Sequence, residues 1–476
     1  MGEKRHWLIR FSAEIVVLTL LGAGAVIVQL DPGTRWFGST LDSSDPAAVL
    51  PPQGLKLPPV AAAGAVAGPL RTVRPSPARV AAAVGPMLRR QTLGRHYAVL
   101  VTDLASGRAV YRAGATTVTP ASTAKLLTMT AALETLGPLA RFKTSVRWVP
   151  RRRELVLVGG GDPFLAATPK QGRSSYPVRA DVVTLAQGAR RRLRALKVRR
   201  VRVGFDDSYF SGPAVNPAWP GTYVPEGVVP PIGPLWVDEG HSGEGFLADP
   251  AAGAGEAFRT ALRDAGLKVS PTARRVRTPS SAVEVASVSS APLGEMVERT
   301  LAVSDNEAAE VIARHVGLAV RQDGSFQAGA GAVLAVLHRL GVRVAGDRLY
   351  DGSGLSRQDR LRPDSLAGVL RLAASPRRPE LRSVLTGLPV AGFTGSLQHR
   401  FARGPAAARG RVRAKTGTLT GVHGLAGVAT DVSGARMGFV IVADRVPVLK
   451  TLDAQLLIDR IAGALGACTC GVGSSS

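Results

Sequence analysis

Runs of apolar residues of two lengths predict an α+β fold. Short runs predict strands at 96–104, 108–112, 411–419, 425–430 and 437–443. Longer runs with helical spacing predict helices at 122–136, 293–302, 306–317, 327–340, 363–374 and 452–465. Late strands next to one closing helix indicate an antiparallel sheet that is covered by helices.

The middle of the chain has a different pattern. It predicts strands at 142–149, 154–158 and 199–205, together with a basic helix at 180–196. The remainder of 164–285 is expected to contain a long loop, because Pro and Gly are frequent there. No internal repeat is present, so a repeat architecture is not expected.

The N-terminal residues have the pattern of an export segment. Lys4, Arg5 and Arg10 precede an apolar stretch at 11–30, so residues 1–30 are expected to be a signal peptide or a membrane anchor. Residues 31–78 are rich in Pro, Ala and Gly and predict an extended linker. We therefore expect an extracytoplasmic protein that is membrane-anchored or associated with the cell wall.

The net charge is strongly positive but does not by itself define a partner. The formal charge is +25, from 60 Lys and Arg residues against 35 Asp and Glu. The basic residues are mostly Arg, are spread along the chain and belong to no nucleic-acid-binding module, so no nucleic-acid partner is expected. An exported basic protein is still attracted to anionic polymers and lipid headgroups of the envelope.

No sequence pattern indicates a cofactor or a metal site. The chain lacks H-E-x-x-H, the P-loop and G-x-G-x-x-G, and it also lacks the G-x-S-x-G elbow. Its two cysteines, Cys468 and Cys470, are too few for zinc. They form a local disulfide or remain thiols, and their spacing leaves both alternatives open.

A serine and a lysine three residues apart are the first candidate catalytic groups. Ser122 and Lys125 begin the helix expected after Pro120, and positions i and i+3 lie on one helix face. A serine hydroxyl needs a base to become a nucleophile. Lysine can be that base when burial lowers its pKa, whereas arginine stays protonated. The S-x-x-K pattern alone is common, and without further motifs it indicates only an ordinary helix start.

Two further motifs follow in an order that makes the assignment specific. Ser304-Asp305-Asn306 lies between two expected helices, and Lys415-Thr416-Gly417-Thr418 lies on an expected strand. Ser304 can pass a proton to a leaving amine, and Asn306 can hold a substrate amide. Lys415, Thr416 and Thr418 can bind a terminal carboxylate, and Gly417 allows the backbone to approach the substrate closely. This ordered trio is typical of penicillin-binding proteins and class A β-lactamases.

The motifs give the chain a resemblance to the low-molecular-mass class C penicillin-binding proteins, which are D-Ala-D-Ala carboxypeptidases and endopeptidases. Further similar segments are Pro120–Leu126, Gly159–Pro163, Asp206–Phe210, Pro217–Trp219, Asp351–Ser356, Leu388–Gly392 and Gly395–Leu397. The resemblance implies Ser122 as nucleophile, Lys125 as base, Ser304 and Asn306 as groups of the second motif, and Lys415 as their partner. It also implies an oxyanion hole from the backbone N–H groups of Ser122 and Thr418.

The resemblance implies a penicillin-binding/β-lactamase-like transpeptidase fold with a second domain inserted into it. The catalytic domain is expected at 79–145 and 286–470, the insert at 146–285 and a disordered tail at 471–476. The interval between the first two motifs is shorter than in relatives with two nested insertions. A second insertion is therefore expected to be reduced or absent near 238–249.

The expected function is a serine-type D-Ala-D-Ala carboxypeptidase/endopeptidase whose partners are peptidoglycan stem peptides, with β-lactams as covalent inhibitors. A β-lactamase shares the three motifs, but the long interval between the first two argues against it. An inactive wall-binding homologue would also fit the charge and the linker. The balance of the two peptidase activities stays open.

Overall fold

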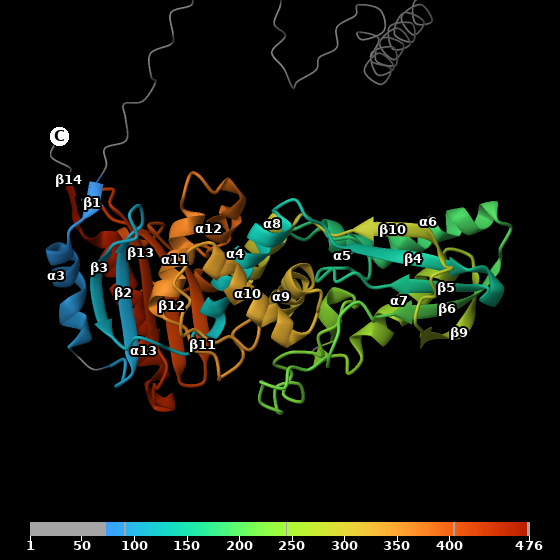
Figure 1. Cartoon of the computed structure of the whole chain (residues 1–476), viewed down its shortest axis with the longest axis horizontal. Coiled ribbons are helices and arrows are strands. Elements are labelled where there is room, and N and C mark those ends of the chain that lie inside the picture. Colours follow the sequence, from blue (N-terminus) through green and yellow to red (C-terminus); the bar gives the residue numbers. More distant parts are fainter. Residues whose placement is uncertain (1–72, 90–91, 244, 403–404, 474–476) are drawn as a thin grey trace, which may run out of the picture. The chain divides into compact units, whose positions relative to one another are not determined.

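The computed structural model describes residues 73–89, 92–243, 245–402 and 405–473 (Figure 1). The signal or anchor expected at 1–30, and the linker as far as residue 72, lie outside these ranges. Among the helices that are described, none is both long and apolar enough to cross a bilayer.

One five-stranded sheet brings the early and late parts of the chain together. Its strands lie in the order β11 (Val412–Leu419), β12 (Val422–Thr430), β13 (Arg436–Ala443), β2 (Tyr97–Asp103) and β3 (Ala109–Gly114). Each neighbouring pair is antiparallel, and β13 beside β2 joins the two distant parts. The antiparallel sheet predicted from the sequence is therefore confirmed.

Helices bury both faces of this sheet, as the alternation of side chains along β13 shows. Phe439 and Ile441 belong to one apolar cluster, whereas Val440 and Val442 belong to the cluster on the opposite face. The first cluster includes α3 (Pro77–Leu88) and α13 (Thr451–Ala467). The second includes α4 (Lys125–Leu136), α8 (Leu293–Val303), α9 (Asn306–Arg321), α10 (Phe326–Arg339), α11 (Pro363–Ala373) and α12 (Ser383–Thr386). This is the predicted α+β arrangement.

A second five-stranded sheet is built from residues 143–289. Its order is β10 (Val283–Ser289), β4 (Lys143–Val149), β5 (Glu154–Val158), β6 (Arg200–Asp206) and β9 (Lys268–Arg275). β4 is antiparallel to both of its neighbours, β10 and β5, whereas β5, β6 and β9 run parallel to one another. Two crossover helices, α6 (Val182–Ala195) and α7 (Pro250–Asp264), make the parallel pairing possible and share an apolar core with the sheet. β4 begins, and β10 ends, a few residues outside the expected insert, 146–285.

Part of this region differs from the sequence prediction. Helix α7 and strands β9 and β10 form where a long Pro/Gly-rich loop was expected. They form because α7 buries Ala254, Phe258 and Leu262 against the second sheet. Near 238–249 the described residues form only a short turn and the small hairpin of β7 (His241–Ser242) and β8 (Gly245–Phe246).

A buried arginine fastens the loop at 207–237 to the helical layer. Arg314 of α9 donates hydrogen bonds to the carbonyl oxygens of Ser211 at 2.7 Å, Ile232 at 2.8 Å and Gly324 at 2.7 Å. Three backbone acceptors satisfy a guanidinium that is almost fully buried. The loop is therefore held against α9, which begins at Asn306, the last residue of the second sequence motif.

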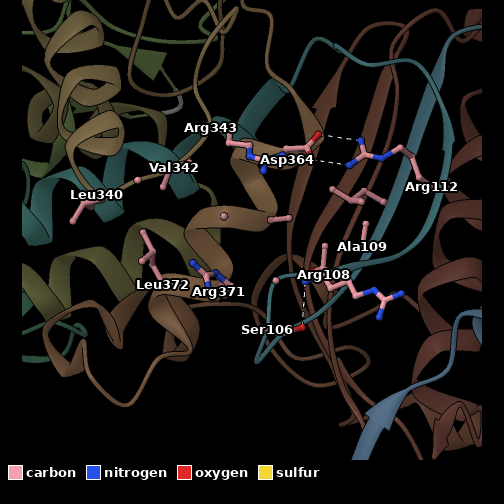
Figure 2. Close-up of a pocket in the computed structure, with 16 residues that line it drawn as sticks. Ser106, Arg108, Ala109, Arg112, Leu340, Val342, Arg343, Asp364, Arg371 and Leu372 are labelled. Carbon is pink, nitrogen blue, oxygen red and sulfur yellow. Dashed lines mark hydrogen bonds and ion pairs between the residues drawn. The ribbon is translucent and has the colours of Figure 1, made fainter.

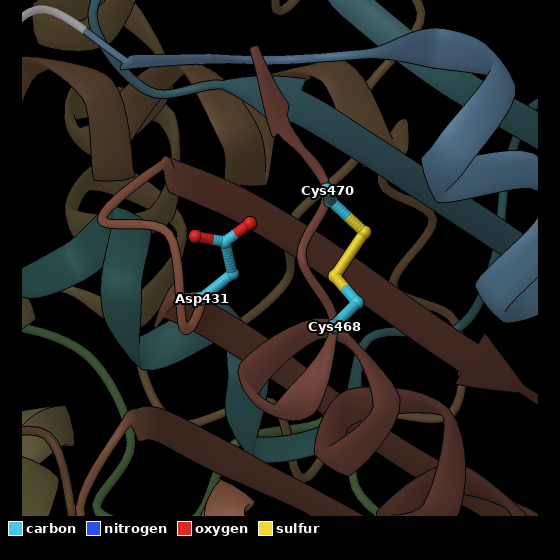
Figure 3. Close-up of side chains that lie close together, drawn as sticks. All are labelled: Asp431, Cys468 and Cys470. Carbon is cyan, nitrogen blue, oxygen red and sulfur yellow. A yellow bond between two sulfur atoms is a disulfide. The ribbon is translucent and has the colours of Figure 1, made fainter. Parts of the chain in front are cut away.

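The two ends of the described chain pair with each other. β1 (Val73–Pro75) is antiparallel to β14 (Gly471–Gly473), so these residues are not the unstructured ends of the linker and tail that the sequence indicated. Cys468 and Cys470 form a disulfide just before β14, which settles the alternative left open by their spacing (Figure 3). The buried carboxylate of Asp431 accepts a hydrogen bond from the Gly471 amide at 2.9 Å, which fixes the start of β14.

Candidate active site

Ser122 lies on a short 3-10 turn that leads directly into α4. The sequence predicted a continuous helix from Ser122, but the structure has a 3-10 turn at Ala121–Ala124 and starts α4 at Lys125. Ala121 has a left-handed backbone with a φ of 47°, which is costly for a residue with a Cβ. This conformation sets the direction of the turn and leaves Ser122 partly exposed, while its neighbours are buried.

Lys125 is fully buried, and its amine is surrounded by three hydrogen-bond acceptors. Nζ lies 2.9 Å from Ser122 Oγ, 2.7 Å from Asn306 Oδ1 and 2.9 Å from the carbonyl oxygen of Ser353. Burial lowers the pKa of Lys125 to about 8, although carboxylates including Asp351 act in the opposite direction. A useful fraction of this amine is therefore neutral near physiological pH and can accept a proton.

The second motif occupies the junction between α8 and α9. Ser304 ends α8 in a left-handed conformation with a φ of 65°, and Asp305 caps α9 by accepting a hydrogen bond from the Ala308 amide. Asn306 is the first residue of α9. The sharp turn at Ser304 and the cap at Asp305 allow Ser304 and Asn306 to contact two different lysines.

The third motif lies on β11, as predicted, and its lysine contacts the second motif. Lys415 Nζ lies 2.7 Å from Ser304 Oγ and 2.9 Å from the carbonyl oxygen of Thr416. Burial, reinforced by the positive charge of Lys125, lowers the pKa of Lys415 well below its usual value. The ammonium form of Lys415 is therefore a stronger proton donor than an ordinary lysine, and the hydroxyl of Ser304 lies within reach to relay its proton.

The residues after Lys415 bring β11 against the turn of Ser122. A Cβ on Gly417 would lie 2.7 Å from the carbonyl oxygen of Pro120, so only glycine fits there without a shift. Thr416 is buried beside Ser396, whose Oγ is 3.1 Å from Thr416 Oγ1, whereas Thr418 is exposed. The structure thus brings all three motifs together, with Gly417 packed on the first of them.

Glu310 supports the segment that contacts Lys125, and no sequence motif indicates this residue. Its buried carboxyl accepts hydrogen bonds from the amides of Gly352 at 3.1 Å and Ser353 at 2.8 Å. These bonds hold the segment whose Ser353 carbonyl contacts Lys125. Burial, with the nearby Asp351, raises the pKa of Glu310 to about 8. Its position four residues after Asn306, on the same helix face, is the one signal that would have found it.

Asp351 organises the same loop from its other side. Its carboxylate accepts hydrogen bonds from the amides of Gly354 at 2.7 Å and Ser356 at 2.6 Å, and from Trp219 Nε1 at 2.8 Å. Asp351 belongs to a segment that resembles the family, but the resemblance implies no role for this residue. The structure shows that Asp351 connects the loop at 207–237 to the backbone that supports Lys125.

Three carboxylates, one of them from Asp305 of the second motif, are explained by protein contacts. Glu239, Asp305 and Glu307 place carboxylate oxygens within 4.8 Å of one another. Arg179 lies 2.9 Å from Glu239 and supplies positive charge. Burial raises the pKa of Glu307 to about 8 and that of Glu239 to about 7, so protons reduce the remaining repulsion. The cluster thereby connects the turn at Asp238–Gly240 to α9.

The helix-covered antiparallel sheet, together with two buried lysines beside partly exposed serines, defines the penicillin-binding and β-lactamase class of folds. A family model described as D-Ala-D-Ala carboxypeptidase 3 (S13) matches residues 80–243 and 246–465. The chain belongs to this family. The family predicted from the ordered motifs is thereby confirmed, and with it a hydrolase of the D-Ala-D-Ala carboxypeptidase type.

Similar proteins align with most of the chain. The carboxypeptidase DacB of Mycolicibacterium smegmatis is 36% identical over 442 residues, which are 90% of this chain and 92% of the relative. The D-alanyl-D-alanine carboxypeptidase of an Actinomadura species is 30% identical over 72% of this chain and 77% of its own. The crystal structure of penicillin-binding protein 4 from Haemophilus influenzae covers 80% of this chain and 97% of its own, with a TM-score of 0.63 and 19% identity. That structure has the same fold.

Proposed function

We propose that the protein is a serine-type D-Ala-D-Ala carboxypeptidase/endopeptidase that acts on peptidoglycan stem peptides through an acyl-enzyme on Ser122. The observation that carries this proposal is the contact of Lys125 Nζ with Ser122 Oγ at 2.9 Å. A buried amine with a lowered pKa is the base that a serine nucleophile needs. The names of the relatives support the substrate class.

In the first step, neutral Lys125 accepts the hydroxyl proton while Ser122 Oγ attacks the carbonyl carbon of the penultimate D-Ala. The C–N bond then breaks, and the terminal amine leaves with a proton that Ser304 delivers from the Lys415 side. An ester on Ser122 remains. Lys125 releases its proton to solvent and Lys415 takes one up, and a water molecule then attacks the ester as Lys125 accepts its proton. That proton passes to Ser122 Oγ, so the shortened peptide leaves and the hydroxyl is restored. The Ser304–Lys415 contact of 2.7 Å supports this route for the proton.

The remaining motif residues hold the substrate in this proposal. The backbone N–H groups of Ser122 and Thr418 would stabilise the oxyanion, as the family resemblance implies. Asn306 would bind a substrate amide, and Lys415 with Thr416 and Thr418 would bind the terminal carboxylate. β-Lactams would acylate Ser122 in the same way, but the opened ring stays attached to the acyl group, so no amine departs.

Labelling of the full chain with a fluorescent penicillin tests the nucleophile. The wild type should carry one label, Ser122→Ala should carry none, and Ser174→Ala, which changes an exposed serine, should be labelled like the wild type. Label retained by Ser122→Ala would refute the assignment. Release of D-Ala from a pentapeptide separates the peptidase from an inactive homologue, and repeated turnover of nitrocefin would instead identify a β-lactamase.

The domain arrangement and the location of the protein belong to the same proposal. The second sheet, with its own apolar core, supports an inserted domain at about 146–285 within a catalytic domain at 79–145 and 286–470. Family membership supports action outside the cytoplasm. Export or anchoring by residues 11–30 rests on their apolar sequence, and cell fractionation of the full chain and of a chain lacking 1–30 would test it.

A further inference from the structure

A cavity lined by arginines lies on the catalytic domain, between the β2–β3 hairpin and α11. It has a volume of about 490 Å³, and its floor includes the apolar residues Leu100, Val342 and Ala367. Its four arginines come from three segments of the chain. Figure 2 shows Arg108 and Arg112 on the hairpin, Arg343 after α10 and Arg371 on α11.

The charge of this arginine cavity is not balanced. Asp364, its one acidic residue, is already bound to Arg112 through two hydrogen bonds of 2.6 and 3.0 Å. Within the described part of the chain, the side chains of Arg108, Arg343 and Arg371 have no hydrogen-bond or ion-pair partner. They leave positive charge on the lining that no described carboxylate neutralises, so the cavity favours a negatively charged ligand.

A second cavity of about 530 Å³ adjoins the first and shares Arg371 and Leu372 with it. This neighbouring cavity adds Arg382 and Arg436, and none of the described residues that line it is acidic. The side chain of Arg371 lies directly over the hairpin turn, because a Cβ on Gly107 would come within 2.7 Å of its Cδ. Arginines therefore extend across two connected hollows rather than surrounding a single one.

The two cavities are remote from the candidate active site. They lie beside β2 and β3, at the opposite edge of the sheet from β11, which carries Lys415. At a spacing of about 4.8 Å between strands, β3 and β11 are roughly 19 Å apart. A ligand in the arginine cavity would therefore occupy a site separate from the one that contains Ser122.

We propose that the two adjoining cavities bind a polyol-phosphate polymer, a soluble chain of repeating phosphodiester groups. Guanidinium groups bind phosphate through paired N–H donors. A tetrahedral phosphodiester accepts such bonds from several directions, which matches arginines that come from separate segments of the chain. Two hollows sharing Arg371 suit successive phosphates of one chain, and the apolar floor suits the carbon atoms between them. This inference goes beyond the proposed peptidase activity and does not depend on it.

Binding of a fluorescent, synthetic glycerol-phosphate oligomer to the full chain, measured by anisotropy, tests the proposal. Arg371→Glu should weaken binding by about ten- to hundredfold, because it removes charge-assisted hydrogen bonds from both cavities. Arg343→Glu changes the first cavity alone and should also weaken binding of the oligomer. The matched control is Arg191→Glu, which removes the same charge from the arginine-rich helix α6 and should leave the affinity nearly unchanged.

Unchanged penicillin labelling and thermal unfolding would show that the variants remain folded, and Arg343→Glu decides if Arg371→Glu does not fold. An equal loss in Arg191→Glu would overturn the proposal, because binding would then follow net charge only. Equal affinity for polyglutamate would overturn the preference for phosphate. Arg371-dependent binding to phosphatidylglycerol vesicles without binding of the oligomer would assign the cavity to a lipid headgroup instead.

Discussion

The amine of Lys125 lies closer to the amide oxygen of Asn306, at 2.7 Å, than to the hydroxyl of Ser122, at 2.9 Å. Asn306 can accept a hydrogen bond from either charge state of the amine through this oxygen. Asn306 therefore holds Nζ of Lys125 beside Ser122 whether the amine is protonated or neutral. The second motif thus positions the base of the first motif, in addition to any contact that it makes with substrate.

Replacing Lys125 with Arg should nearly abolish acylation although the charge is kept. Arginine stays protonated at any pH at which the protein is folded, so it cannot accept the proton of Ser122. We expect the rate of acylation by a β-lactam to fall by at least about a thousandfold, near the upper part of the range for loss of a general base. Stopped-flow or quenched labelling measures this rate. A rate within tenfold of the wild type would show that Lys125 is only structural.

The rate of acylation should rise with pH through about 8 and level off above it. The base must be neutral, and the pKa of Lys125 is lowered to about 8 by burial, so its active fraction grows as the pH increases. In Asn306→Asp a carboxylate would lie beside the ammonium and raise the pKa of Lys125. The rise should therefore move to higher pH in that variant. A pH-independent rate between 6 and 9 in the wild type would contradict the role of Lys125 as base.

Gly354→Ala should damage the site far more than Gly346→Ala. Both glycines have a positive φ, of 81° and 89°, so both substitutions carry the same conformational cost. A Cβ on Gly354 would lie 2.0 Å from the carbonyl oxygen of Ala121, whereas a Cβ on Gly346 has nothing within 4 Å. We expect Gly354→Ala to slow penicillin acylation by at least about tenfold, because the turn carrying Ser122 must move. Acylation rates and melting temperatures that are equal in the two variants would disprove this relationship.

His315 should make the fold sensitive to mild acid. Its ring stacks on Phe142 at 3.6 Å and Nε2 lies 2.9 Å from the carbonyl oxygen of Gly161, while burial lowers its pKa to about 4. The unfolded chain binds the proton more readily, so the free energy of unfolding should fall as the pH drops from about 6.5 to 4. The expected loss is about 3 kcal/mol. Denaturant unfolding at several pH values measures it, and the contribution should be absent in His315→Phe.

Most of the main sheet could be predicted because its strands are local apolar runs. The positions of Ser122, Ser304 and Lys415 followed from short motifs, whose order indicated that they act together. Helix α7 was missed because Gly253 and Gly255 resemble loop residues in the sequence. In the structure they allow close packing, since a Cβ on Gly255 would come within 2.6 Å of the Phe205 ring.

The supporting residues could not be predicted from local patterns. Glu310 is one of two glutamates in α9, and its importance depends on the amides of Gly352 and Ser353, which are more than 40 positions further along the chain. The parallel pairing of β5 with β6 likewise depends on a crossover helix rather than on either strand. Such relationships arise from packing between distant segments, which the order of residues does not display.

The pairing of β1 with β14 brings the beginning and the end of the described chain to one place. Val73 faces Gly473, while Asp431 anchors the C-terminal strand through Gly471. The chain therefore enters β1 and leaves β14 at neighbouring positions. A short linker could join Val73 to Gly473, so a circular permutant with new termini in an exposed turn should be tolerated. The fold is in this sense nearly circular, and a mechanical pull on its two ends would separate β1 from β14 one hydrogen bond at a time.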